Sequence, residues 1–278
     1  FRSGFVTCTP ELKTILKIRS STFIFGGPVP PPYLAAISAV CDILMSPEYD
    51  VLLDGPRKAE QLENLKTLIR NVGRAGISVF GYNFSIAGVA GRVKGPFARA
   101  NTEAVGMDGS FDKPMPNGMV WNMVYDRNAP PGNIPSATPE QLWQRLQDFL
   151  DALLPVAEEA GVTLAAHPDD PPMPTVRGQP RLVYQPRLYQ KLLDLHPSPR
   201  NALEFCLGSL AEMTEGDIYD VVDAYSRQGK LGYVHFRNVR GKVPYYKETF
   251  IDEGDIDMLR VLRSEEHTSE LQSPYVIS

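Results

Sequence analysis

The segment TPEQLWQRLQDFLDALLPVAEEAGVTLAAH at Thr138–His167 places an amphipathic helix directly before a short apolar strand. Thr138 is a typical helix N-cap, Pro139 suits the first helical position, and Gly161 suits the residue that ends a helix. The apolar residues of one helical face lie between them, at Leu142, Leu146, Phe149, Leu150, Leu153 and Ala157. The strand candidate VTLAAH follows at once, at Val162–His167. A helix joined this closely to a strand is one unit of an α/β fold.

The same alternation of strand and helix recurs along the chain. Further strand-like runs are ISVFGYNF (Ile77–Phe84), ALEFC (Ala202–Cys206), LGYVHF (Leu231–Phe236) and ETFID (Glu248–Asp252). A second amphipathic helix is predicted between Asp217, as its N-cap, and Gly229. This alternation predicts a parallel sheet, and the number of units favours a (β/α)8 barrel over an open sheet. No glycine-rich phosphate-binding motif supports a nucleotide-binding fold.

The composition excludes several classes of protein. The chain of 278 residues has 28 Lys and Arg against 33 Asp and Glu, a net charge of -5. We therefore expect no general nucleic-acid binding, because no excess of cations is present to displace phosphate counterions. No apolar run reaches the ~18 residues that a membrane span needs. The three cysteines, Cys8, Cys41 and Cys206, are too few and scattered for a disulfide framework, which favours a reducing, cytoplasmic location.

Four strand candidates finish on or next to a residue that can bind a metal: His167, Cys206, His235 and Asp252. In a parallel barrel the carboxyl ends of all strands meet at one face, where active sites are built. Two imidazoles, a thiolate and a carboxylate suit Zn, Fe(II) or Mn(II), and ligand softness favours Zn or Fe. Each residue also has a structural explanation: a hydrogen-bonded histidine, a core cysteine, or an aspartate that caps a helix.

Cationic side chains follow the third strand candidate of this group. Arg237 and Arg240 flank Asn238 and could clamp a carboxylate on the catalytic face, although they could equally be solvated loop charges. A metal and an arginine that face an anionic substrate suit proton abstraction next to a carboxylate, since both stabilise the developing enediolate. Asp255 precedes an apolar helical run and is a better helix N-cap candidate than Asp252.

From about Tyr49 to Leu262 the chain resembles the mannonate dehydratases of hexuronate degradation. The matching motifs, in the order of the family, are YDVLLDGP (Tyr49–Pro56), EQLENLKTLIRNVGRAGI (Glu60–Ile77), GYNFSIAGV (Gly81–Val89), HPDDPP (His167–Pro172), LEFCLGS (Leu203–Ser209), YVHFRNVRG (Tyr233–Gly241) and FIDEGDIDM (Phe250–Met258). The resemblance implies a metal-dependent barrel of the xylose-isomerase-like kind. It also implies loss of water from D-mannonate, a sugar acid, to give 2-dehydro-3-deoxy-D-gluconate. The sequence leaves open whether the chain forms a homo-oligomer.

The resemblance also implies a cofactor and a set of site residues. The family uses Mn(II) or Fe(II), and its ligands correspond to His167, Cys206, His235 and an aspartate, placed at Asp252 with Asp255 as the less favoured choice. Asn83, Arg237, Asn238 and Arg240 are the predicted substrate contacts, and Arg237 and Asp255 the candidate catalytic residues. The family's tyrosine beyond the last metal aspartate has no clear counterpart in this sequence.

Both ends of the chain resemble foreign sequence. SSTFIFGGPVPPPYLAAISAV (Ser20–Val40) resembles a pyridoxal-phosphate enzyme of the α-oxoamine synthase or class II aminotransferase kind, and RSEEHTSELQS (Arg263–Ser273) resembles a translated sequencing adapter. These resemblances predict a foreign fragment at 1–48, a partial barrel at 49–262 and a non-native tail at 263–278. The barrel is then an incomplete (β/α)8 barrel. The alternatives to a dehydratase are a chimeric, truncated reading frame without activity, a sugar isomerase of the same barrel type and, last, a pyridoxal-phosphate enzyme.

Overall fold

The computed structural model describes residues 49–109 and 113–265. The fragment predicted at 1–48, and all but the first three residues of the tail predicted at 263–278, lie outside the described residues. Among the described residues, no helix combines the length and the apolar character that a membrane crossing requires.

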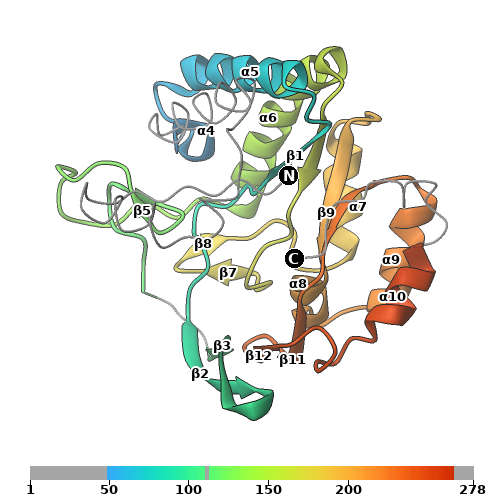
Figure 1. The fold of residues 1–278 in the computed structure, drawn as a ribbon. Helices are drawn as coiled ribbons and strands as arrows, with labels where there is room; N and C mark the ends of the chain where they lie inside the picture. The colour runs from blue at the N-terminus through green and yellow to red at the C-terminus, as the bar shows by residue number, and fades with distance from the viewer. Residues whose placement is uncertain (1–48, 110–112, 266–278) are drawn as a thin grey trace, which may run out of the picture.

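A four-stranded parallel sheet forms the centre of the molecule (Figure 1). Its order is β1 (Val79–Tyr82), β6 (Thr163–Ala166), β9 (Asn201–Cys206) and β10 (Leu231–His235). Four of the five predicted strands are thus confirmed, each within a few residues of its predicted ends. The register places His235 directly opposite Cys206, so the carboxyl ends of the last two strands lie side by side.

Helices pack against the sheet through a continuous apolar core. They are α4 (Tyr49–Leu53), α5 (Lys58–Arg74), α6 (Pro139–Ala160), α7 (Arg187–Leu195), α8 (Leu207–Glu212), α9 (Ile218–Arg227) and α10 (Met258–Glu265). The ring of Phe149 on α6 lies 5.2 Å from Tyr82 and 5.3 Å from Phe84, between centroids, at the end of β1. Parallel strands followed by covering helices make an incomplete (β/α) barrel, as the sequence predicts.

Helix α6 has the ends that its sequence predicts. The Thr138 side chain accepts a hydrogen bond from the Gln141 amide, and the Gln141 side chain accepts one from the Thr138 amide, which forms a capping box. Gly161 ends the helix at a φ of 69°, where a Cβ would be strained. Helix α9 is likewise capped by Asp217, which accepts hydrogen bonds from the amides of Tyr219 and Asp220.

Replacing Thr138 with Ala tests how much the capping box stabilises the barrel. We expect Thr138→Ala to lower the free energy of unfolding by about 1 kcal/mol, because the Gln141 amide at the start of α6 loses the hydroxyl that accepts its hydrogen bond. Chemical denaturation measures the change. Thr67→Ala is the matched control: among the described residues, this exposed threonine in α5 bonds only to the Glu63 carbonyl of its own helix, so alanine there should cost nothing. Equal losses for the two variants would contradict the assignment.

A second, antiparallel sheet lies beside the carboxyl edge of the first (Figure 1). Its order is β11 (Asn238–Lys242), β12 (Tyr245–Thr249), β3 (Thr102–Asp108) and β2 (Arg92–Ala98), with a 3-10 turn at Arg99–Asn101. Two short ribbons, β4 (Met119–Val120) with β5 (Met123–Val124) and β7 (Thr175–Val176) with β8 (Gln179–Pro180), complete the described strands.

The prediction that Glu248–Asp252 forms another strand of the parallel sheet is wrong. Strand β12 ends at Thr249 and runs antiparallel to β11, from which only Val243 and Pro244 separate it. A parallel neighbour needs a crossover of a dozen or more residues, whereas two residues suffice for a hairpin. Gly241, at a φ of 86°, lies beside the Tyr245 carbonyl within this hairpin, a position that would strain any other residue.

Candidate metal centre

Three predicted ligands converge at the carboxyl edge of the parallel sheet. His167 follows β6, Cys206 ends β9 and His235 ends β10. One donor atom from each, an imidazole nitrogen or the thiol sulfur, lies within 4.8 Å of the other two. Two nitrogens and a sulfur at this spacing fit a transition-metal ion, and three protein ligands leave positions open for a substrate.

The three residues change one another's protonation. Burial alone would raise the pKa of the Cys206 thiol, but the hydrogen bonds from both imidazoles and the Arg237 charge hold this pKa well below its usual value. Burial likewise opposes protonation of His167, yet the adjacent Cys206 thiolate raises the pKa of His167 to about 9. The hydrogen bond with Cys206 also raises the pKa of His235. These shifts favour a Cys206 thiolate, the form that binds metals, beside protonated imidazoles whose protons a bound metal would displace.

The His167 ring is oriented by the backbone that follows it. Its Nδ1 lies 2.5 Å from the Pro168 carbonyl oxygen, which can only accept, so Nδ1 carries a proton and donates it. The other nitrogen, Nε2, then remains for the metal. Metal-binding histidines commonly have such a carbonyl partner, which fixes both the tautomer and the plane of the ring.

The structure does not bring Asp252 to this group. Asp252 lies in the turn after β12, its side chain is 65% exposed, and its carboxylate accepts a hydrogen bond of 2.7 Å from Arg99 Nη1. Its predicted role as the fourth metal ligand stays a prediction, and that role would require the carboxylate to leave Arg99. Asp255 is also exposed and accepts a hydrogen bond of 2.8 Å from the Gly241 amide, which ties the turn to the β11–β12 hairpin. Neither aspartate lines the pocket at the three ligands.

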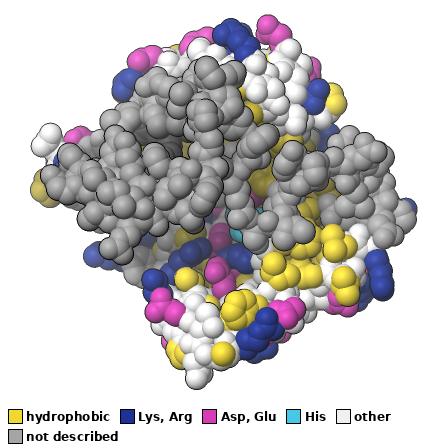
Figure 2. Space-filling model, in the orientation of Figure 1, with side chains coloured by type: hydrophobic (Ala, Val, Ile, Leu, Met, Phe, Trp, Pro, Cys, Tyr) yellow, Lys and Arg dark blue, Asp and Glu magenta, His cyan; other side chains and the backbone are white. Residues whose placement is uncertain are grey.

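The three ligands open into a pocket of about 700 Å³ between the two sheets. Cationic and acidic side chains meet near the middle of the face shown in Figure 2. Asn83, a predicted substrate contact, lines the pocket, and its Oδ1 accepts a hydrogen bond of 3.4 Å from the Trp121 indole. The Asn83 amide therefore lies where a bound molecule can reach it.

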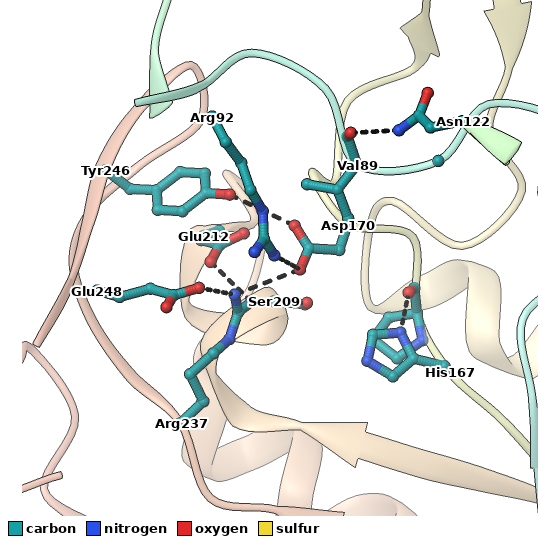
Figure 3. Close-up of polar contacts among 12 residues, drawn as sticks. Val89, Arg92, Asn122, His167, Asp170, Ser209, Glu212, Arg237, Tyr246 and Glu248 are labelled. Carbon is teal, nitrogen blue, oxygen red and sulfur yellow. Dashed lines mark hydrogen bonds and ion pairs between the residues drawn. The ribbon is translucent and has the colours of Figure 1, made fainter. Parts of the chain in front are cut away.

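Arg237 also lines the pocket, but its guanidinium is surrounded by carboxylates (Figure 3). Nη1 donates to Glu248 at 2.7 Å and forms an ion pair with Asp170 at 3.3 Å, while Nη2 donates to Glu212 at 2.8 Å and Ser209 at 3.0 Å. Burial would lower the pKa of Arg237, but Cys206 and the three carboxylates raise it above its ordinary value. The side chain is only 11% exposed. Arg237 therefore organises one wall of the pocket rather than reaching into open space.

A glycine makes this wall possible. Gly208, at the start of α8, lies directly under the Arg237 side chain, and a Cβ there would collide with Nε. Because Gly208 has no side chain, the Arg237 guanidinium can lie against Ser209 and Glu212 of α8. The motif LEFCLGS thus supplies both a metal ligand and the surface on which Arg237 packs.

Asn238 and Arg240 have structural partners. Asn238 is buried, and its Nδ2 donates to the carbonyls of Ile251 and Ile256 at 2.6 and 2.9 Å. Arg240 donates from Nε and Nη2 to the Glu253 carbonyl at 3.0 and 2.7 Å and does not line the metal pocket. Both residues hold the turn that follows β12, and their predicted substrate contacts stay predictions.

Three residues that line the pocket were not predicted from the sequence: Glu204, Tyr233 and Arg92. The Oε1 atom of Glu204 lies 3.8 Å from His167 Nε2, and burial raises the pKa of this carboxyl. Glu204 precedes Cys206 by two residues, and Tyr233 precedes His235 by two. Since alternate residues of a strand share a face, that spacing was the signal that could have revealed both. Arg92 carried no such signal, because it begins a strand of the second sheet.

Comparison with known proteins identifies relatives for most of the described chain. The family model for D-mannonate dehydratase (UxuA) matches residues 135–274, about half of the sequence. This match continues beyond the boundary predicted at Leu262, so the predicted domain division stays a prediction. The curated mannonate dehydratase of Streptococcus pneumoniae (strain 70585) is 31% identical over 77% of this chain and 62% of its own length. Mannonate dehydratase 2 of Halalkalibacterium halodurans is 28% identical over 77% of this chain and 66% of its own.

A solved structure gives the same result. The crystal structure of mannonate dehydratase from Streptococcus suis serotype 2 superposes with a TM-score of 0.66 and 30% sequence identity, over 77% of this chain and 60% of that one. The first curated relatives are thus matched over about 62% of their length.

Proposed function

The chain belongs to the D-mannonate dehydratase (UxuA) family, and on that premise we propose that it removes water from D-mannonate in the cytoplasm. The product would be 2-dehydro-3-deoxy-D-gluconate. One observation carries the proposal: His167, Cys206 and His235 lie at the carboxyl ends of three neighbouring strands, and their donor atoms lie within 4.8 Å of one another in a pocket large enough for a six-carbon acid.

His167, Cys206 and His235 would hold a Mn(II) or Fe(II) ion. Such an ion would supply Lewis-acid chemistry, withdrawing charge from substrate oxygens as the C2 proton is lost. Asp252 would be a fourth ligand only if its carboxylate exchanged Arg99 for the ion. The family membership, rather than the donor set, favours manganese or iron over zinc.

The side chains of the pocket would bind and orient the substrate. The Asn83 amide can hydrogen-bond a substrate hydroxyl, and the Glu204 carboxyl can accept a hydrogen bond from a hydroxyl bound beside His167. Tyr233 donates a hydrogen bond to Glu204 and so fixes the direction of that carboxyl. In the overall reaction the proton on C2 and the hydroxyl on C3 leave as water. The resulting enol then tautomerises to the 2-keto acid.

Incubation of the purified chain with D-mannonate tests the proposal. We expect a 2-keto acid to form when Mn(II) or Fe(II) is present and to disappear when a chelator removes the metal. D-mannose under the same conditions is the control for the sugar isomerase alternative, which predicts conversion of the neutral sugar instead. A properly folded, metal-loaded chain that forms no keto acid would contradict the proposal and favour the chimeric chain without activity.

A further inference from the structure

Two guanidinium groups line the pocket, and their surroundings differ. Of the described lysines and arginines, only Arg92 and Arg237 contribute to the lining. Arg237 is engaged by three carboxylates and is 11% exposed. Arg92 is 43% exposed and makes one ion pair, at 3.7 Å, with Asp170. This distance is longer than that of a good charge-assisted hydrogen bond, so the described residues do not saturate the Arg92 guanidinium.

The partner of Arg92 does not depend on it. Asp170 forms an ion pair with Arg237 at 3.3 Å and accepts a hydrogen bond of 3.4 Å from the Tyr246 hydroxyl (Figure 3). If Arg92 turned toward a ligand, Asp170 would keep these two partners. The move would therefore leave no buried carboxylate without compensation, which is the usual obstacle to breaking an ion pair.

The backbone at Arg92 is held in place while its side chain is exposed. Arg92 begins β2 and pairs with Met107 of β3. The preceding loop is fixed at Val89, whose carbonyl accepts a hydrogen bond of 2.6 Å from Asn122 Nδ2. Asp170, the ion-pair partner of Arg92, lies three residues after the metal ligand His167. The antiparallel sheet thus presents a cation beside the loop that carries a metal ligand (Figure 3).

We propose that Arg92 binds the carboxylate of the sugar-acid substrate and makes the pocket select acids over neutral sugars. This inference rests on the proposed function and specifies how the same pocket recognises its substrate. A guanidinium matches a carboxylate through two parallel hydrogen bonds, and the partly buried pocket strengthens them. Arg237 keeps a positioning role, since its hydrogen bonds hold Asp170, Glu212 and Glu248.

Equilibrium binding to the Mn(II)-loaded full-length chain tests the proposal without requiring turnover. Isothermal titration with D-mannonate and with the neutral polyol D-mannitol is compared for wild type and Arg92→Gln. We expect Arg92→Gln to weaken D-mannonate binding by roughly 10- to 100-fold, the loss expected for a hydrogen bond to a charged group. Binding of D-mannitol should stay within twofold. The D-mannonate affinity of Arg92→Lys should lie between those of wild type and Arg92→Gln, because lysine keeps the charge and loses the planar guanidinium.

Lys94→Gln is the matched control, since Lys94 lies two residues along β2, is exposed, pairs only with Glu103 in the described chain and lies outside the pocket lining. It removes the same charge and should leave both affinities unchanged. The proposal is overturned if Arg92→Gln binds D-mannonate within twofold of wild type, if it weakens both ligands equally, or if wild type binds no D-mannonate. Arg92-dependent binding without turnover would overturn the dehydratase function and leave this inference standing. If Arg92→Gln turns over D-mannonate with an unchanged KM, the dehydratase function stands and the role proposed for Arg92 is overturned.

Discussion

His235→Ala should reduce the affinity for Mn(II) by more than about 100-fold. Loss of an outer partner of a metal ligand already lowers affinity by roughly 10- to 100-fold, and His235 contributes a donor atom itself. The two remaining donors, His167 and Cys206, come from adjacent strands and cannot enclose the ion. His235 is partly exposed at the end of β10, so its truncation should leave the fold intact. Competition with a chromogenic chelator measures the affinity.

His196→Ala is the matched control for this loss. His196 follows α7, pairs with Asp151 at 2.6 Å and lies outside the pocket lining, so its removal should leave Mn(II) affinity unchanged. The Mn(II) affinity of Asp252→Asn decides whether that carboxylate is a ligand. A loss of affinity comparable to that of His235→Ala would mean that Asp252 leaves Arg99 to bind the ion. Wild-type affinity in His235→Ala would refute the three-residue centre.

The three converging ligands could be predicted because topology alone brings them together. His167, Cys206 and His235 each finish an apolar run, and parallel strands align their carboxyl ends whatever the details of packing. Asp252 finishes a similar run, yet the chain reverses through Val243 and Pro244 before it. The sequence ETFID has the apolar content of a strand, but nothing within it specifies the direction in which the strand runs.

The roles of the arginines could not be predicted, because they depend on segments distant in the sequence. Arg237 has the position and the charge expected of a carboxylate clamp. Its carboxylate partners, however, come from the loop after β6, from α8 and from β12, and no local pattern reveals that they meet at one guanidinium. Arg92 was overlooked for the same reason: the antiparallel sheet that carries it joins residues more than a hundred positions apart, Met107 with Tyr246 among them.

Arg237→Met should lower the free energy of unfolding by about 3–5 kcal/mol, the usual cost of removing one partner from a buried ion pair. The substitution keeps the volume of the side-chain stem and deprives Glu212, which is fully buried, of its cationic partner. Urea denaturation measures the change. Arg227→Met is the matched control: Arg227 forms an exposed ion pair with Asp223 one turn away on α9, and its loss should cost less than about 0.5 kcal/mol.

The dependence of this loss on pH identifies Glu212 as its source. Burial raises the pKa of Glu212 above its ordinary value of 4.5, and the Arg237 charge opposes that rise, so Arg237→Met should raise this pKa further. A carboxyl whose pKa is higher in the folded than in the unfolded state loses stability as the pH rises above the unfolded value. The deficit of Arg237→Met should therefore be larger at pH 8 than at pH 5. Arg237→Met combined with Glu212→Gln should reduce that difference to the part that comes from Cys206, since no ionisable group then remains at position 212. A deficit of the same size at both pH values would show that it comes from lost packing or from the other two carboxylates.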